Sequence, residues 1–283
     1  MNKVGLVLEG GGMRGVYTAG VLDYLMKKSI EIPYIIGVSA GACHGSGYVS
    51  KQIGRGKKIT IDYIDDKRYL SIKNYLKEKS VFGMNFIFNE IPKKLEPYDL
   101  KAFDNFKGCF KVVTTDCNTG TAFYIDCKNT SNVFDALRAS SSLPLFSPIV
   151  KYEGKDLMDG AVIDSIPAKK ALEDGCEKLI IVLTRNEGFK MKPLIKIKPL
   201  IKLKYRKYPK YIKSILTRYI RYNQTLKLIE ELEVQGKAFV IRPSKTLEVG
   251  RFEKNKKRLE TLYIQGYEDT KRILNKLEQF LKD

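Results

Sequence analysis

The sequence predicts an α/β fold in which a central, mostly parallel β-sheet is flanked by helices on both faces. Short apolar runs rich in β-branched residues alternate with helix-like stretches along the chain, which is the pattern of parallel strands joined by crossover helices. The length of 283 residues suits one large α/β unit or two ordinary ones, and the contents of 43% hydrophobic and 29% charged residues are normal for a folded protein.

The expected strands share β-branched and aromatic residues and lie near 4–8, 34–38, 110–115, 121–126, 178–184 and 237–242. The expected helices share a helical spacing of apolar residues and lie near 15–28, 40–52, 133–139, 166–174, 224–235, 253–264 and 267–282. The turn at 118–120 predicts a hairpin between the third and fourth strands. Residues 54–108 are polar and lysine-rich, and we expect helical insertions and loops there.

The first apolar run ends after about five residues at Glu9, so we expect a buried strand there rather than a signal peptide. No apolar run approaches the roughly 18 residues of a membrane span. The five cysteines are an odd number without Cys-x-x-Cys spacing. This usage argues against a disulfide framework or a zinc site and favours reduced thiols in a cytoplasmic protein.

Ser39 lies at the centre of GVSAG, directly after a strand-like run and before small residues. This is the layout of a nucleophile elbow, in which Gly37 and Gly41 let the chain pass closely and a helix N-terminus supports developing negative charge. His44 is the one histidine of the sequence. On a helix it would lie about 7.5 Å along the axis and about 140° around it from Ser39, which is out of reach for a general base. Either Ser39 is not catalytic, or a carboxylate or lysine takes its proton.

The stretch LEGGGMRG places glycines between a strand end and a helix start, where backbone N–H groups can face an anion. Gly10, Gly12 and Gly15 fit the G-x-G-x-x-G pattern of dinucleotide sites. Such sites also need an acidic residue at the end of the second strand, and the serine of the elbow occupies that place. We therefore favour an oxyanion hole, to which Arg14 could add positive charge.

Asp159, Gly160 and Ala161 form a turn after a short apolar step and before a helix. A loop carboxylate at this point could face the elbow. Asp164 and Asp116 are alternatives, and each is also plausible as a cap or turn residue.

Taken together and in this order, GGGMRG at 10–15, GVSAG at 37–41 and DGA at 159–161 resemble the three motifs of the patatin-like phospholipase family. ALRASSSLPLFSP at 136–148 also resembles the family's segment between elbow and aspartate. The similarity covers residues 4–172. The continuation, with VLTR, IRPS and GYED, resembles a bacterial subgroup that carries its own C-terminal region.

The resemblance implies the family's three-layer fold, with a catalytic core at 4–172. The remainder, 173–283, is then a helical, basic C-terminal region. It is expected to complete the sheet with strands near 178–184 and 237–242, and to add a basic insertion at 188–222 and terminal helices.

The resemblance also implies a Ser-Asp dyad, which makes the missing catalytic histidine expected. Ser39 would attack an ester carbonyl, Asp159 would accept its proton, and no metal or cofactor would be needed. Family members act on phospholipids, lysophospholipids or triacylglycerols. The residues that the resemblance implies for the oxyanion hole are Gly10, Gly11, Gly12, Arg14, Gly15 and Ala40.

The basic segment 188–222 holds twelve Lys or Arg and no Asp or Glu. Removing these charges from the formal net charge of +19 leaves +7 for the rest, so the excess is concentrated. Its lysines alternate with Leu, Ile and Tyr, which suits peripheral contact with an anionic bilayer. The alternative is a solvated lid packed on the domain. No nucleic-acid motif accompanies the charge, so we expect no nucleic-acid partner.

The expected function is therefore a serine lipid acyl hydrolase of phospholipase A, lysophospholipase or esterase type, located in the cytoplasm or on the inner face of the membrane. The alternative is a non-catalytic lipid- or partner-binding protein that retains the fold. The sequence leaves open the head group, the acyl length, the positional preference and the oligomeric state.

Overall fold

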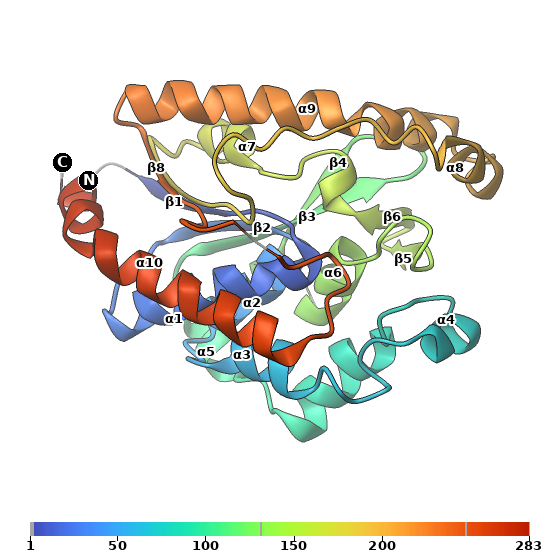
Figure 1. Cartoon of the computed structure of the whole chain (residues 1–283), viewed down its shortest axis with the longest axis horizontal. Helices are drawn as coiled ribbons and strands as arrows, with labels where there is room; N and C mark the ends of the chain where they lie inside the picture. The colour runs from blue at the N-terminus through green and yellow to red at the C-terminus, as the bar shows by residue number, and fades with distance from the viewer. Residues whose placement is uncertain (1–2, 131, 247, 283) are drawn as a thin grey trace.

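The computed structural model describes residues 3–130, 132–246 and 248–282. Eight strands of these residues form one sheet (Figure 1). In chain order they are β1 (Val4–Leu8), β2 (Tyr34–Val38), β3 (Cys109–Asp116), β4 (Ala122–Asp126), β5 (Val150–Tyr152), β6 (Lys155–Asp159), β7 (Lys178–Val182) and β8 (Ala238–Ile241). Their order across the sheet is β5-β6-β3-β2-β1-β7-β8, and β4 also pairs with β3.

The centre of the sheet is parallel. Strand β1 pairs in parallel with β2 and β7, β2 with β3, and β7 with β8. Strands β1, β2 and β7 are buried along nearly their whole length, and their sequences VGLVL, YIIGV and KLIIV supply apolar side chains to both faces. Strands β4 and β6 run antiparallel to β3, and β5 runs antiparallel to β6. The sheet is thus mostly parallel, as expected.

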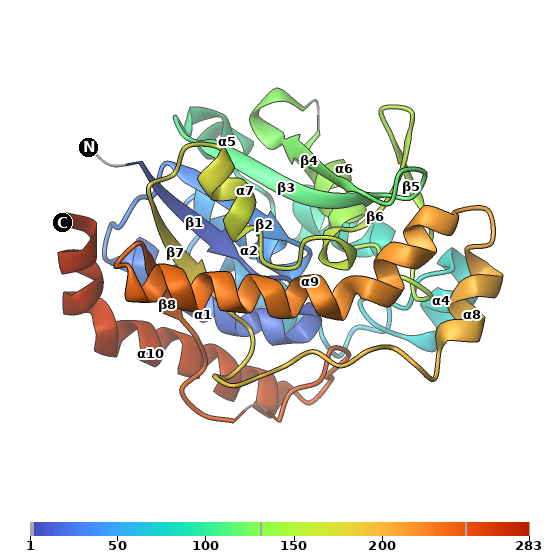
Figure 2. The ribbon, with the colours of Figure 1, turned by 90° about the horizontal axis from the view of Figure 1, so that it is seen from above.

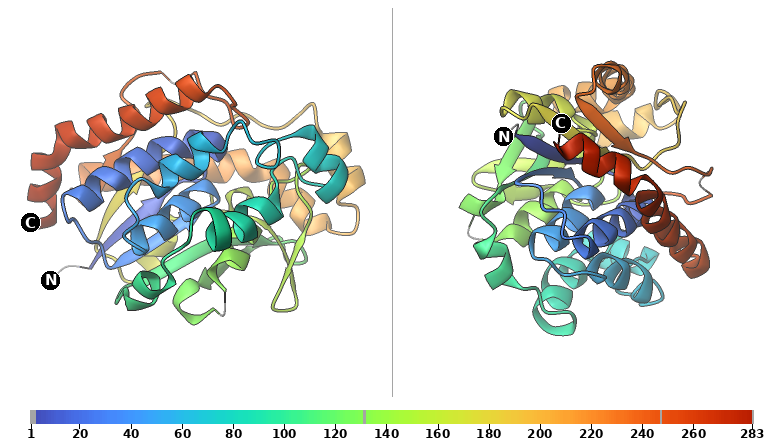
Figure 3. Two further views of the ribbon diagram at one scale, coloured as in Figure 1. Left: turned by 90° about the horizontal axis from the view of Figure 1, so that it is seen from below. Right: turned by 90° about the vertical axis from the view of Figure 1, so that its left-hand side faces the viewer.

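Helices cover both faces of the sheet, which gives three layers (Figures 1 and 3). One face carries α1 (Val16–Lys27), α2 (Ala40–Val49) and α10 (Lys256–Lys282), and the other carries α7 (Ala168–Glu173) and α9 (Pro209–Val234). Along β1, Leu6 and Leu8 pack into the first core, with residues of α1 and α10. Val7 points the other way and packs into the second core, with residues of α7 and α9. The three-layer α/β prediction is confirmed.

Residues 54–108 form helices and loops, as the sequence predicts. Their helices are α3 (Arg55–Lys57), α4 (Ile72–Glu78), α5 (Leu100–Asn105) and π-helical segments at Lys58–Asp62 and Phe86–Leu95. The predicted hairpin is present too, because β3 and β4 pair antiparallel on either side of the turn at 118–120. Two further helices are α6 (Val133–Ser140) and α8 (Lys198–Lys204).

The C-terminal helix differs from the prediction. The two helices expected at 253–264 and 267–282 are one continuous helix, α10. Gly266 lies inside it, where a Cβ atom would come 2.1 Å from the carbonyl oxygen of Tyr17. The glycine therefore marks a close helix–helix contact rather than a break, and Gly20 of α1 serves the same contact from the other side.

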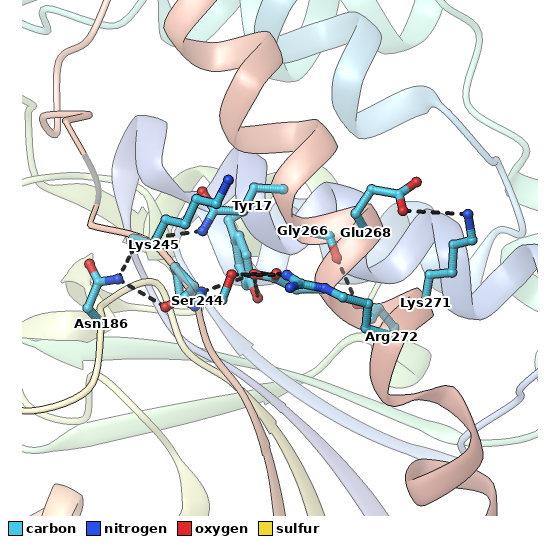
Figure 4. A network of polar contacts seen from close by, with 12 residues as sticks. Tyr17, Asn186, Ser244, Lys245, Gly266, Glu268, Lys271 and Arg272 are labelled. Carbon is cyan, nitrogen blue, oxygen red and sulfur yellow. Dashed lines mark hydrogen bonds and ion pairs between the residues drawn. The ribbon is translucent and has the colours of Figure 1, made fainter.

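A polar network fastens α10 to α1 and to the loop after β8 (Figure 4). The hydroxyl of Tyr17 donates to Asp269 Oδ2 at 3.1 Å, and the backbone N–H of Ser244 donates to the same oxygen at 3.0 Å. The Ser244 hydroxyl and the Arg272 guanidinium donate to Oδ1. The Asp269 carboxylate thus lies at the centre of the C-terminal packing. This packing brings the loop before α10 against the core.

Two other elements were not foreseen in full. Helix α9 starts at Pro209 rather than near residue 224, because Tyr211, Ile215 and Tyr222 follow a helical spacing and are buried. The hairpin of β5 and β6 was also missed, since its strands are short and lack an alternating apolar pattern.

All five cysteines are free thiols. Within the described ranges, no helix has both the length and the apolar character that crossing a membrane requires.

Candidate active site

Ser39 occupies a strained turn between β2 and α2. Its backbone angles are φ 52° and ψ −121°, in a region that L-residues rarely adopt. The turn needs glycines on both sides, because a Cβ on Gly41 would come 2.6 Å from the Leu8 carbonyl oxygen and one on Gly37 would come 2.7 Å from Cα of Ala42. This is the strand–turn–helix context of a nucleophile elbow.

Ser140, at the end of α6, holds this turn in place. Its hydroxyl accepts a hydrogen bond from the Ser39 N–H at 2.8 Å and donates to the carbonyl oxygen of Val113 at 2.6 Å. Ser140 is fully buried. No signal in the sequence points to this role, because Ser140 lies in a run of three serines of similar appearance.

Asp159 ends β6 and is 1% exposed. Its Oδ1 atom accepts the N–H of Ala161 at 2.8 Å, and its own N–H donates to the carbonyl oxygen of Ser142 at 2.9 Å. Its carbonyl oxygen accepts from the Thr115 hydroxyl at 2.8 Å. A Cβ on Gly160 would come 2.2 Å from the carbonyl oxygen of Val113, so the glycine after Asp159 lets this turn lie against β3.

The registers of the sheet bring Ser39 and Asp159 together. Val38, the last residue of β2, pairs with Val113, and Asp159 pairs with Thr114. The two strands therefore end against consecutive residues of β3, although one runs parallel to it and the other antiparallel. Ser39 and Asp159 line one cavity of about 310 Å³, whose space includes its open mouth.

Burial raises the pKa of the Asp159 carboxyl. The N–H of Ala161, the nearby guanidinium groups of Arg218 and Arg251 and the Ser39 hydroxyl act in the opposite direction but do not outweigh burial. The Oδ2 atom has no hydrogen bond of normal geometry with any described residue. The Ser39 hydroxyl is close enough to lower the pKa of this carboxyl, but it is not tightly bonded to it. Oδ2 is thus available to accept a proton.

The other candidate bases lie elsewhere. Asp164 accepts from the Tyr124 hydroxyl at 2.9 Å, and Asp116 accepts from the N–H of Asn118 at 2.8 Å as a turn residue. His44 is buried and lines an apolar pocket, and burial lowers the pKa of its imidazole to about 4. None of the three lines the cavity that Ser39 and Asp159 share.

The glycine-rich loop forms another wall of the same cavity. The N–H of Gly10 donates to the Ser165 carbonyl oxygen at 3.3 Å, which leaves it engaged. The N–H groups of Gly11 and Gly12 have no acceptor among the described residues, and both glycines line the cavity with Ser39. Gly12 has φ +59°, and a Cβ there would come 2.7 Å from Cγ of Arg251. These two N–H groups are the loop's available donors.

The three remaining residues expected near the oxyanion differ in their placement. Gly15 allows the loop to approach α2, because a Cβ on it would come 2.6 Å from Cβ of Ala40. Ala40 is the first residue of α2, where a backbone N–H has no acceptor within the helix. Arg14 lines the cavity and is 6% exposed, and its Nε has no partner among the described residues.

A second, apolar pocket, of about 800 Å³ with the space of its open mouth included, meets the first at Ser39. The segment 54–108 supplies most of its apolar wall, and Met13 and Leu143 complete it. The apolar lining residues from that segment are Ile59, Tyr69, Phe82, Met84, Ile87 and Phe88. The sequence predicted insertions around a site here, but it gave no pattern that singles out these side chains.

Two arginines of the basic segment turn inward. Arg218 donates from Nε to the Ser165 hydroxyl at 3.2 Å and lines the cavity of Ser39. Arg221 donates to the carbonyl oxygens of Ile163 and Val162 at 3.1 and 3.0 Å. The other ten cations of the segment are exposed. In the described parts of the chain, no cluster of three or more His, Cys, Asp or Glu side chains is arranged to hold a metal ion.

The chain is similar to known families and proteins. The family model for patatin-like phospholipases matches residues 6–172. The chain belongs to the patatin-like phospholipase family. A second family model, a domain of unknown function (DUF6363), matches residues 208–282 of this patatin-like protein. Arg218 and Arg251 both lie in that second region.

Similar proteins include both bacterial and fungal relatives. The uncharacterized protein YjjU of Escherichia coli is 27% identical over 188 residues, which are 64% of this chain and 52% of YjjU. The lysophospholipase NTE1 of Meyerozyma guilliermondii is 30% identical over 190 residues, 63% of this chain and 12% of that protein. The chain therefore spans about half, or less, of these relatives.

The crystal structure of VipD from Legionella pneumophila has a similar fold, with a TM-score of 0.55. The match covers 98% of this chain and 67% of VipD at 14% sequence identity. This likeness concerns the fold alone.

Proposed function

We propose that this patatin-like protein is a serine lipid acyl hydrolase in which Ser39 is the nucleophile and Asp159 the proton acceptor. The observation that carries the proposal is the meeting of β2 and β6 at consecutive residues of β3, which gives Ser39 and Asp159 one cavity. The core at 4–172 holds both residues, and the region 173–283 closes over them.

The proposed reaction begins when Ser39 Oγ attacks the carbonyl carbon of an ester and its proton passes to Asp159 Oδ2. Burial raises the pKa of this carboxyl, which makes it a stronger base than an exposed aspartate. The N–H groups of Gly11 and Gly12, with that of Ala40 at the start of α2, stabilise the negative charge on the carbonyl oxygen. The alcohol then leaves with the proton from Asp159. Water attacks the acyl-enzyme and gives a proton to Asp159. The bond from the acyl carbon to Ser39 Oγ then breaks, Asp159 returns the proton to Oγ, and the fatty acid is released.

The acyl chain fits the apolar pocket. Its wall of Phe, Met and Ile side chains begins at Ser39, so a carbonyl at the nucleophile would leave the chain in this pocket and the alcohol in the smaller cavity. This division supports lipids as the substrate class.

We also propose peripheral contact with an anionic membrane, on the cytoplasmic side, through α8 and its neighbour α4. Both helices lie at the same end of the molecule (Figures 1 and 2), and Lys204 Nζ lies 6.0 Å from the ring centroid of Tyr75. The exposed apolar side chains of this end include Leu203 (69% exposed), Ile72 (80%) and Leu76 (72%). Exposed lysines surround them, a combination that suits an anionic lipid surface.

The hydrolase proposal is tested by steady-state turnover of a lysophospholipid and of a short p-nitrophenyl ester. Wild type should turn over both, whereas Ser39→Ala should lose turnover by several orders of magnitude and keep its melting temperature within a few degrees. Turnover by Ser39→Ala at the wild-type rate would refute the assignment. A folded wild type with no turnover of any acyl ester would favour the non-catalytic lipid-binding alternative.

A further inference from the structure

Three arginines surround the cavity of Ser39, and two of them come from the C-terminal region. Arg14 follows the glycine-rich loop, Arg218 lies on α9, and Arg251 lies in the loop before α10. The backbone carbonyl oxygen of Arg251 accepts the N–H of Met13 at 3.1 Å, which fixes this loop against the glycine-rich loop. The C-terminal region therefore forms part of the wall beside the nucleophile.

Arg14 is buried, Arg218 and Arg251 are half-buried, and the guanidinium groups of all three are hardly paired. Each carries five N–H donors. Among the described residues, their side chains make one hydrogen bond, from Arg218 Nε to the Ser165 hydroxyl, and no ion pair with a carboxylate. An unpaired buried cation is costly, so the arrangement calls for an anion that the protein itself does not supply.

The two nearest carboxylates, Glu9 and Asp159, attract these guanidinium groups but form no hydrogen bond or ion pair with them in the described parts of the chain. Glu9 accepts instead from the Thr184 hydroxyl at 3.0 Å, the Thr184 N–H and the Tyr222 hydroxyl at 2.7 Å. Asp159 directs Oδ1 to the N–H of Ala161. Burial, and after it repulsion from Arg185 and Arg251, lowers the pKa of Arg14 to about 10. Burial and repulsion from Arg251 lower the pKa of Arg218 to about 10 as well, although Asp159 and Glu9 act in the opposite direction.

The position of the cluster indicates which part of a substrate the anion belongs to. The apolar pocket accounts for the acyl chain, so the arginine cavity lies on the alcohol side of the ester. The anion that lipids carry on that side is a phosphate, and planar guanidinium groups bind phosphate oxygens by paired hydrogen bonds.

We propose that Arg218 and Arg251, together with Arg14, bind the phosphate of the substrate, so that the C-terminal region selects acyl esters with a phosphate near the scissile bond. This inference rests on the proposed hydrolase function. A free phosphate ion would be bound by the same chemistry, and the experiment separates the two sources.

The first arm compares two soluble esters below their micellar concentrations, 1-octanoyl-glycerol 3-phosphate and 1-octanoylglycerol. The measured quantity is the ratio of their kcat/KM values. Wild type should favour the phosphate ester, and Arg218→Gln and Arg251→Gln should each lower the ratio by about 10- to 100-fold. Arg251→Lys, which keeps the charge, should lower the ratio by a smaller factor. The matched control is Arg258→Gln, which removes an exposed cation of the same region and should leave the ratio unchanged.

The second arm measures binding without catalysis, as the rise in melting temperature caused by inorganic phosphate relative to chloride at equal ionic strength. Wild type and Arg258→Gln should be stabilised, and Arg218→Gln and Arg251→Gln should not. If phosphate binds through these arginines but neither ester is hydrolysed, the anion site stands and the hydrolase function fails. If both esters are hydrolysed and the ratio of their kcat/KM values is the same in wild type and all variants, the hydrolase function stands and the substrate assignment is wrong. Phosphate binding combined with such an unchanged ratio would assign the arginines to a free anion instead.

Discussion

The hydroxyl of Ser140 accepts a hydrogen bond from the backbone N–H of Ser39 at 2.8 Å. Ser39 has a positive φ, and a strained residue keeps its conformation only when its surroundings hold it. Because the same hydroxyl also donates to the Val113 carbonyl oxygen, the elbow is tied to β3, the strand against which Asp159 ends.

Ser140→Ala should therefore lower kcat more than it changes KM. The loss of two buried hydrogen bonds costs about 1–3 kcal/mol, part of which would appear as displacement of the nucleophile, so we expect kcat to fall about 10- to 100-fold. The check is a kcat and KM determination with a short ester, with the melting temperature measured alongside. A loss of stability with kcat unchanged would make Ser140 structural only.

Asp159→Asn should abolish turnover and stabilise the fold at neutral pH. The folded-state pKa of this carboxyl is raised above its ordinary value, so the folded state binds more protons between the two pKa values and wild-type stability falls as pH rises through that window. Asparagine removes this penalty while keeping an oxygen for the Ala161 N–H. A rise of a few degrees is expected, since about 1 kcal/mol corresponds to roughly 2–4 °C in a protein of this size.

The measurement is thermal unfolding of wild type and Asp159→Asn across pH. The stabilisation should be present at pH 7 and disappear near pH 3, below the ordinary pKa of aspartate. In wild type, kcat/KM should fall as acid protonates Asp159, at a pH above that ordinary value. An inactive variant that is less stable at pH 7 would contradict the burial argument.

Met84→Trp should shorten the acyl chain that the enzyme accepts. Met84 is buried in the wall of the apolar pocket, and a larger ring there would fill space assigned to the chain. The ratio of kcat/KM for a decanoyl ester to that for a butanoyl ester should fall about tenfold or more, since each buried CH₂ contributes about 0.8 kcal/mol. Met84→Ala is the matched variant and should move the ratio the other way. Equal ratios in all three proteins would remove the acyl chain from this pocket.

Reversing two lysines of α8, Lys198→Glu and Lys202→Glu, should release the protein from anionic vesicles. Each cation near such a surface contributes up to about 1 kcal/mol, and salt weakens that contribution. Co-sedimentation with phosphatidylglycerol vesicles at low salt measures it. The control reverses Lys276 and Lys282, which are exposed in the last part of α10, and should still bind. The C-terminal end of α10 lies at the end of the molecule opposite α8 (Figure 2). Equal binding of wild type to phosphatidylcholine, or loss of binding in both variants, would contradict a specific membrane face.

The parallel strands and the elbow could be predicted because their signals are local. A buried parallel strand is recognised as an apolar run, and GVSAG contains the small residues that the turn of a nucleophile elbow requires. Gly266, in contrast, falls between the two helices that we expected, since its packing against Tyr17 cannot be inferred from neighbouring residues. The same holds for Ser140, whose partners lie far away in the sequence.

The arginines of α9 show most clearly what could not be predicted from the sequence. Arg218 and Arg221 counted as part of a basic surface segment, because composition cannot tell which side of a helix faces the core. Their inward position depends on how α9 lies across the sheet, which was itself underestimated in length.

The central claim is that Ser39 is an activated nucleophile and that Asp159 activates it. The most direct measurement is the rate and site of covalent labelling by a fluorophosphonate, followed by mass spectrometry of peptides. We predict one adduct, on Ser39, in wild type, no adduct in Ser39→Ala, and labelling slowed at least 100-fold in Asp159→Asn, because general-base assistance contributes about 10²- to 10⁴-fold. An adduct on another residue, or labelling of Asp159→Asn at the wild-type rate, would contradict the account.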